Sequence, residues 1–329
     1  MQATIRDVAR AAGVSIATVS RVLQGHDNVR PDTRDRVNAA IDELQFRPNR
    51  LGRSLAERRH AANGIVLPDL SGPYFAEVVL GYEAVAAELG RSVLILTTHG
   101  RKAAPSMVED MAGRCDGLVV LGRTVPDEVV TRLAARGLPL VLLARPAVGD
   151  IDSVQAENTE SAARLAELVV GKGARRLVFV GDPDASPDVQ ERWEGLTRVA
   201  GQAHGVTLDV VRPAGFGEAH GAAVTASALA ADALPDAYMC ANDELALGVL
   251  SVLREHGVDV PGRVQVTGWD DVMAARYAGL TTVRQPMREL GATAARLLDE
   301  RISGSRTDPR HEVLPTQLVV RTSTSRKEP

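Results

Sequence analysis

Cysteine is nearly absent from this chain of 329 residues, which has only Cys115 and Cys240. Two cysteines exclude a disulfide framework and a zinc site built from several cysteines, and we expect both to be inert, buried thiols in a reducing cytoplasm. The sequence also lacks any apolar run near the roughly 18 residues that a membrane span requires. Its polar N-terminus has no signal-peptide core. These absences favour a cytoplasmic protein.

Charge is distributed unevenly along a chain of otherwise ordinary composition. Hydrophobic residues make up 45% and charged residues 24%, which excludes wholesale disorder, and the length suggests about two domains. Residues 1–60 contain 11 arginines and seven acidic residues, a net charge of +4, whereas residues 61–329 carry a net charge of −8. A basic N-terminal segment followed by an acidic remainder is expected when one small domain binds a polyanion.

The N-terminal residues predict a helix-turn-helix. Thr4, with an acidic residue three positions later, is a variant of the capping box that starts a helix, and Gly13 stands where the chain must leave that helix. Ser15 is a second N-cap, for a helix that runs from Ile16 to about Leu23. The alternative is an ordinary helical hairpin.

Small and apolar residues at fixed spacing favour the helix-turn-helix over the hairpin. Ala9 allows the two helices to approach closely, and Val19 fills the space between them. With Val19 inward, the opposite face can reach into a major groove. That face presents Ile16, Ala17, Ser20 and Arg21.

A third helix and a basic segment follow. Pro31 suits a first helical position, and Val37, Ile41 and Leu44 form an apolar stripe that closes a three-helix core. Residues 46–59 crowd five arginines around two leucines one helical turn apart. Since such a helix is too short for independent stability, we expect it to be disordered when free and helical only against a partner surface. The alternative is a flexible basic linker.

The remaining residues alternate short apolar strands with helices. Strands are predicted at 64–68, 92–96, 116–121 and 139–143, and a second series at 176–181, 236–240 and 264–268. Continuously apolar strands indicate parallel sheets covered on both faces. Two such runs predict two doubly wound lobes, with a ligand in the cleft between them at the carboxyl ends of the strands.

Enzyme motifs are absent from this α/β part. Residues 215–221 resemble a dinucleotide fingerprint but place the third glycine one residue late, and the chain has neither a Walker A loop nor a G-x-S-x-G elbow. His220 and His256 have no second ligand at metal spacing. We therefore expect no catalytic residues, no cofactor and no metal.

The motifs together resemble the LacI/GalR family of transcriptional regulators. In the head and hinge, the motifs that carry the resemblance are residues 4–9, 13–15 and 18–23, and the segment from residues 47–49 to Leu55. In the core, which resembles the family's periplasmic-binding-protein-like effector domain, they are residues 69–75, 241–248, 268–271, 280–286 and 318–321. The resemblance implies a helix-turn-helix domain at 1–45, a hinge at 46–60 and an effector-binding and dimerisation core at 61–329. The N-lobe would be about 61–155 plus 286–315, and the C-lobe about 156–285 plus 316–329.

The resemblance also implies a sequence-specific repressor that binds a pseudo-palindromic operator as a homodimer. No heptad-bearing extension follows the last strand, so we expect a dimer and not a tetramer. Paired hinges would fold on DNA, with Leu55 wedged into the minor groove, although Gly52 departs from the better helix formers common in the family. The implied DNA-binding residues are Thr4, Ser15, Ile16, Ala17, Thr18, Ser20, Arg21, Asn28, Arg50, Arg53 and Leu55. Ile16 and Ala17 would read shape and thymine methyls, whereas Arg21 can pair bidentately with guanine.

For the effector, the resemblance implies a site of polar groups and aromatic walls. Its residues are Asp69, Tyr74, Phe75, Arg192, Phe216, Asn242 and Asp270. These side chains fit a polyhydroxylated ligand, and Ser186 and Asp188 do not match the purine-binding pattern, so a sugar or sugar derivative is favoured. Against this, Ala144 is apolar where some sugar-binding members carry an acid.

Several alternatives stay open. Asp270 could cap a loop and Arg192 could form a salt bridge without touching a ligand. The effector could be a non-sugar metabolite or a corepressor. Two alternatives lie outside the class of transcriptional regulators: a solute-binding protein and a sugar-modifying enzyme. In the repressor hypothesis, an effector that closes the lobes changes the separation of the two hinge starts and so undoes marginal hinge helices.

Overall fold

The computed structural model describes residues 3–23, 28–46, 60–98 and 100–325. The chain divides into two compact units, residues 1–60 and residues 61–329, and each is described by itself. Within the described ranges, no helix is long and apolar enough to cross a membrane.

The first unit is a three-helix head, as predicted. Its helices are α1 (Ile5–Ala12), α2 (Ile16–Leu23) and α3 (Pro31–Glu43). One side chain from each helix, Val8, Val19 and Val37, is fully buried in the common core. Ile41 and Leu44 are half-buried and pack against the same cluster, so the predicted apolar stripe is confirmed.

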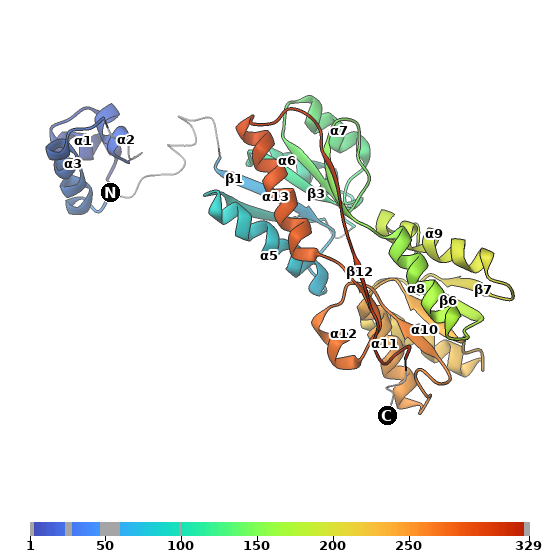
Figure 1. Ribbon diagram of the computed structural model, residues 1–329. Helices are drawn as coiled ribbons and strands as arrows, with labels where there is room; N and C mark the ends of the chain where they lie inside the picture. The colour runs from blue at the N-terminus through green and yellow to red at the C-terminus, as the bar shows by residue number, and fades with distance from the viewer. Residues whose placement is uncertain (1–2, 24–27, 47–59, 99, 326–329) are drawn as a thin grey trace. The chain divides into compact units, whose positions relative to one another are not determined.

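The second unit begins with a six-stranded sheet. Its elements are β1 (Ala62–Leu67), α5 (Pro73–Glu88), β2 (Ser92–Thr97), α6 (Ala104–Ala112), β3 (Gly117–Leu121), α7 (Asp127–Ala135), β4 (Leu140–Leu143) and β5 (Asp152–Ala156), joined later by α13 (Met287–Ser303) and β11 (His311–Leu314). The strand order is β11-β5-β4-β3-β1-β2, and every neighbouring pair is parallel. Because strand side chains alternate between faces, Ile65 packs with α5 and α13 while Val66 packs with α6 and α7 on the other face (Figure 1).

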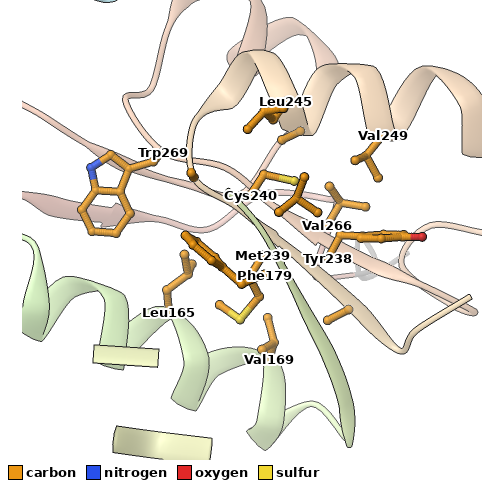
Figure 2. Close-up of a cluster of buried hydrophobic side chains, with 14 of the residues drawn as sticks. Leu165, Val169, Phe179, Tyr238, Met239, Cys240, Leu245, Val249, Val266 and Trp269 are labelled. Atoms are coloured by element: carbon orange, nitrogen blue, oxygen red, sulfur yellow. The ribbon is translucent and has the colours of Figure 1, made fainter. Parts of the chain in front are cut away.

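A four-stranded parallel sheet forms the other lobe. Its elements are α8 (Thr159–Gly171), β6 (Arg176–Val180), α9 (Pro187–Gln202), β7 (Thr207–Val211), α10 (Glu218–Ala230), β8 (Ala237–Cys240), α11 (Asp243–Glu255), β9 (Gln265–Thr267) and α12 (Met273–Ala278). The order is β7-β6-β8-β9. Figure 2 shows Leu165 of α8 beside Phe179 and Met239, whereas Leu245 of α11 lies with Cys240. The two doubly wound lobes are therefore confirmed, and both cysteines are free and buried.

The structure contains strands that apolar runs did not predict. One is β5, whose Asp152 is fully buried. Its carboxylate is satisfied by hydrogen bonds from Arg301 and Arg306, so a charged residue is tolerated inside the sheet. The pair β10 (Thr282–Arg284) and β12 (Gln317–Val319) is antiparallel, and each strand is too short to give a clear pattern.

The chain passes between the two lobes at residues 157–158, 285–286 and 315–316. Asn158 and Gln285 lie at two of these crossings and are buried, 1% and 3% exposed. The crossings therefore bring polar side chains to the junction of the lobes.

Candidate functional site

In the head, two helix caps position the predicted recognition helix α2. The carboxylate of Asp7 accepts hydrogen bonds from the backbone N–H of Thr4 at 3.0 Å and from its hydroxyl at 2.7 Å. Gly13 ends α1 at φ +68°, in the left-handed region that favours glycine. Ser15 Oγ accepts from the backbone N–H of Thr18 at 3.1 Å, which satisfies a free donor at the start of α2. Both predicted N-caps are present.

One face of α2 is accessible. Val19 is fully buried and Ala9 is 6% exposed, whereas Ile16 is 46% exposed, and Arg21 is also exposed. The head therefore presents an apolar side chain and a guanidinium together. The predicted DNA-binding residues that the structure describes, all exposed or half-buried, are Thr4, Ser15, Ile16, Ala17, Thr18, Ser20, Arg21 and Asn28. Arg50, Arg53 and Leu55 lie outside the described residues.

In the core, Arg192 is the centre of a group that we call the interlobe cluster: Tyr74, Asn158, Asp188, Glu191, Arg192, Trp269, Asp270 and Gln285. Arg192 is only 6% exposed. Its Nε donates to Asn158 Oδ1 at 2.9 Å, and its Nη1 donates to the carbonyl oxygen of Ala241 at 2.7 Å. Its Nη2 lies 3.9 Å from an Asp188 oxygen, and the guanidinium carbon lies 4.5 Å from the ring centroid of Trp269. Two of the three guanidinium nitrogens, Nε and Nη1, thus already donate hydrogen bonds within the protein.

Three carboxyl groups of the cluster have raised pKa values. Burial raises the pKa of Asp188 to about 6 and that of Asp270 to about 7, and the charge of Arg192 opposes both shifts. Burial also raises the pKa of Glu191, although Asn158 Nδ2 donates to this carboxylate at 3.0 Å. One guanidinium therefore faces three acidic groups that resist ionisation.

The loop after β9 holds Asp270 in place. Asp270 has φ +113° and Asp271 has φ +59°, a conformation that costs free energy for residues other than glycine. The backbone N–H of Asp270 donates to Val283 at 2.8 Å, and Asp271 accepts from Arg284 and Arg321 at 2.7 and 2.6 Å. These contacts keep the loop in its strained form. They also show that Asp271, rather than Asp270, carries the structural ion pairs of the loop.

Tyr74 brings the other lobe to the cluster. Its ring packs edge-on against Phe75, with centroids 5.3 Å apart and an interplanar angle of 81°. Within the described part of the chain, its buried hydroxyl has no hydrogen-bond partner. Burial and the charges of Asp188 and Asp270 all raise the pKa of Tyr74. The predicted residues Tyr74, Arg192 and Asp270 therefore lie close enough for the charges of Arg192 and Asp270 to act on the Tyr74 hydroxyl.

Asn242 and Phe216 form a second pair beside this cluster. Asn242 caps α11, since its Oδ1 accepts from the backbone N–H of Leu245 at 3.0 Å. Its Nδ2 donates to the carbonyl oxygen of Phe216 at 3.0 Å. The predicted ligand group Asn242 is thus engaged in positioning the loop that carries the half-buried Phe216.

Asp69 has local contacts. Its carboxylate accepts from the backbone N–H of Ser71 at 2.7 Å and from the hydroxyl at 2.5 Å. After burial, its charge is the largest cause of the raised pKa of Glu244. Gly72 has φ +81°, in the region that favours glycine, and a Cβ there would lie 2.6 Å from Glu244 Oε2 and displace that side chain. The carboxylate of Asp69 is thus held by Ser71, and its charge acts on Glu244.

Sequence reasoning missed several members of the interlobe cluster. Trp269 and Gln285 stand inside segments that carried the family resemblance, yet neither was assigned to the site. Gln285 Nε2 donates to Asp270 Oδ1 at 2.6 Å. Asp188 lies four residues before Arg192 on α9 and Glu191 lies next to Arg192 in the chain, so helical spacing could have placed both near Arg192. Asn158 has no such signal, because it lies 34 residues away and only the fold brings it to Arg192.

The comparisons with known proteins agree with this architecture. Residues 4–49 match the lacI family of bacterial regulatory proteins, and residues 166–324 match the periplasmic binding protein-like domain. The catabolite control protein A of Staphylococcus xylosus is 30% identical over 329 residues, covering 98% of this chain and all of that protein.

Solved structures match over the same length. The Lac repressor bound to ONPG in its repressed state has a TM-score of 0.87 at 27% identity, with 98% of this chain and 100% of that chain covered. The Lac repressor dimer bound to operator and the anti-inducer ONPF has a TM-score of 0.85 at 27% identity, with coverage of 98% and 99%. The complex of the regulator CelR with cellobiose has a TM-score of 0.71 at 30% identity, with coverage of 98% and 99%.

A helix-turn-helix head followed by a periplasmic-binding-protein-like core defines a ligand-responsive transcriptional regulator. The chain belongs to the LacI family of bacterial regulatory proteins. Members of this family regulate transcription and are not enzymes, which agrees with the missing catalytic motifs.

Proposed function

We propose that this protein is a repressor that binds a pseudo-palindromic operator as a homodimer and releases it when a small hydroxyl-rich effector binds at the interlobe cluster. A sugar or sugar derivative is the favoured effector. One observation carries this proposal: buried polar side chains from both lobes converge and keep hydrogen-bonding atoms without protein partners in the described structure, among them Tyr74 Oη, Asp188 Oδ1 and Gln285 Oε1.

The chemistry of the cluster suits a ligand with several hydroxyl groups. Carboxyl oxygens of Asp188 and Asp270 can accept from hydroxyls, and Arg192 Nη2 can donate to a ring or hydroxyl oxygen. Tyr74 and Phe75 supply aromatic faces for the apolar side of a sugar ring. The cellobiose bound by the relative CelR supports this ligand class.

The exposed face of α2 supports the DNA partner. Arg21 would pair with a guanine, while Ile16 and Ala17 would read shape and thymine methyl groups. The Lac repressor relative binds its operator as a dimer, which supports a homodimer here. The hinge roles of Arg50, Arg53 and Leu55 remain predictions from sequence.

Coupling would pass through the crossings between the lobes. A ligand that bonds to Tyr74 in one lobe and to Arg192 and Asp270 in the other favours a closed arrangement. In a dimer, closure would change the separation of the two hinge starts near residue 60, and marginal hinge helices would lose their pairing.

Two measurements on the full-length chain test this proposal. Selection from random DNA should return a pseudo-palindrome with an invariant G·C pair at the Arg21 contact and relaxed positions opposite Ile16 and Ala17. Selection without a shared sequence, or without that G·C preference, contradicts the DNA assignment.

The second measurement is operator affinity during titration with a panel of sugars. A sugar should weaken operator binding, and Asp270→Ala should bind the operator normally but lose this response. The matched control is Asp209→Ala, because Asp209 is exposed on β7, and it should keep the response. An unchanged response in Asp270→Ala contradicts the assignment, and a ligand that tightens binding would instead make the protein a corepressed regulator.

A further inference from the structure

The interlobe cluster has an excess of hydrogen-bond acceptors and of acidic groups. Asp188 is 6% exposed and Gln285 is 3% exposed. No described residue donates to Asp188 Oδ1 or to Gln285 Oε1, and both atoms are shielded from solvent. Since Gln285 Nε2 bonds to Asp270, the free amide oxygen of Gln285 lies beside that carboxyl group. A buried acceptor without a donor costs free energy, so these atoms point to a ligand that supplies donors.

Arg192 cannot balance the acidic groups or serve an anion well. Its Nε and Nη1 are bonded to Asn158 and Ala241, and the ring of Trp269 lies against the guanidinium. Nη2 makes no hydrogen bond to a described residue and lies 3.9 Å from a carboxylate oxygen of Asp188. The paired N–H donors that would hold a phosphate or carboxylate in a fork are therefore committed to the protein.

Protons balance only part of the acidic charge at neutral pH when no ligand is bound. Burial raises the pKa values of Asp188 and Asp270 to about 6 and about 7, so each carboxyl group retains its proton more readily than an exposed aspartate. A bound cation would stabilise the ionised carboxylates in place of these protons.

We propose, on the basis of the function proposed above, that the effector carries a protonated amine next to its hydroxyl groups, as in an amino sugar. The ammonium group would lie among Asp188, Asp270 and the amide oxygen of Gln285. Hydroxyl groups would reach Tyr74 and Arg192 Nη2. Neutral sugars would satisfy the same acceptors without balancing the charge, and sugar phosphates and sugar acids would meet uncompensated carboxylates.

Matched ligands that differ in one group test this proposal on the wild-type full-length chain. The panel pairs glucosamine, galactosamine and mannosamine with glucose, galactose and mannose, and adds the three N-acetylated amines and glucose 6-phosphate. Isothermal titration calorimetry should find at least one amine that binds at least tenfold more tightly than both its hydroxyl and its N-acetyl counterpart. Asp188→Asn should reduce that preference to less than threefold, whereas Asp209→Asn on exposed β7 should keep it.

The outcomes separate this proposal from the proposed function. Equal or tighter binding of a neutral or phosphorylated sugar, lost in Arg192→Ala, overturns the amine class but leaves the cluster as an effector site. The absence of binding by all three amines also overturns it. Failure of the DNA selection would overturn the regulator assignment without bearing on which ligand binds the core.

Discussion

Replacing Asp188 by asparagine should stabilise the unliganded core at neutral pH, although the change removes the acidic neighbour of Arg192. Asp188 lies in the first turn of α9 and is 6% exposed. Burial raises its pKa to about 6 from the ordinary value of 3.8, with the charge of Arg192 opposing the rise. The folded protein therefore binds this proton more tightly than the unfolded chain does.

The effect on the free energy of unfolding follows from the two pKa values. Below about pH 4 the carboxyl group is protonated in both the folded and the unfolded state. The protonated group then makes its full stabilising contribution to the free energy of unfolding. This contribution is lost as the pH rises from the unfolded value through about 6, because the folded state must then ionise a buried group. The whole change corresponds to about 3 kcal/mol, of which about 2 kcal/mol falls between pH 4.5 and pH 8.

Asparagine has nearly the shape of a protonated aspartate and does not ionise. The free energy of unfolding of Asp188→Asn should therefore exceed that of the wild type by an amount that grows by about 2 kcal/mol from pH 4.5 to pH 8. Asp270 titrates in both proteins, but removing the charge of Asp188 lowers the pKa of Asp270, which adds to the pH-dependent difference in the same direction.

Urea unfolding of the full chain, followed by tryptophan fluorescence, measures this difference. The two tryptophans of the chain are Trp193 and Trp269, and both pack in the lobe that holds Asp188. Asp209→Asn is the matched control, and its offset from the wild type should not change with pH. An offset for Asp188→Asn that is constant, or that grows toward acid pH, would refute the reasoning.

Three further substitutions test other parts of the structure. Gly81→Ala should lower the free energy of unfolding by about 1–3 kcal/mol, because its Cβ would overlap the carbonyl oxygen of Arg288 where α5 packs on α13; normal stability in urea would contradict that packing. Asp152→Asn should cost about 3–5 kcal/mol at neutral pH. Although burial acts the other way, arginine hydrogen bonds lower the pKa of Asp152, so the wild type loses this contribution in acid and the two unfolding curves should converge there. Val19→Ala should destabilise the head by about 1–3 kcal/mol and weaken operator binding, while the tryptophan-monitored urea transition of the core stays unchanged.

Local patterns were enough to predict the head and most strands of the core. The caps at Thr4 and Ser15, the turn at Gly13 and the buried Val19 depend on neighbours within a few residues, so their spacing alone predicts the helix-turn-helix. Continuous apolar runs predicted parallel strands for the same reason, since a strand covered on both faces has no polar face. β5 was not predicted because its buried Asp152 interrupts the apolar pattern. The hydrogen bonds that satisfy this carboxylate come from arginines about 150 positions away.

The sequence by itself determined the class of protein, the positions of its main elements and, through the family resemblance, the residues Arg192 and Asp270. Only the tertiary structure decided which groups surround them. Asp188 lies one helical turn before Arg192 on α9, but Asn158 and Gln285 come from separate segments and carry no periodic signal. They become neighbours of Arg192 and Asp270 because the chain crosses between the lobes at residues 157–158 and 285–286. Burial at that junction raises the carboxyl pKa values and leaves acceptors without donors, and burial is a property of the assembled fold that no single segment of sequence contains.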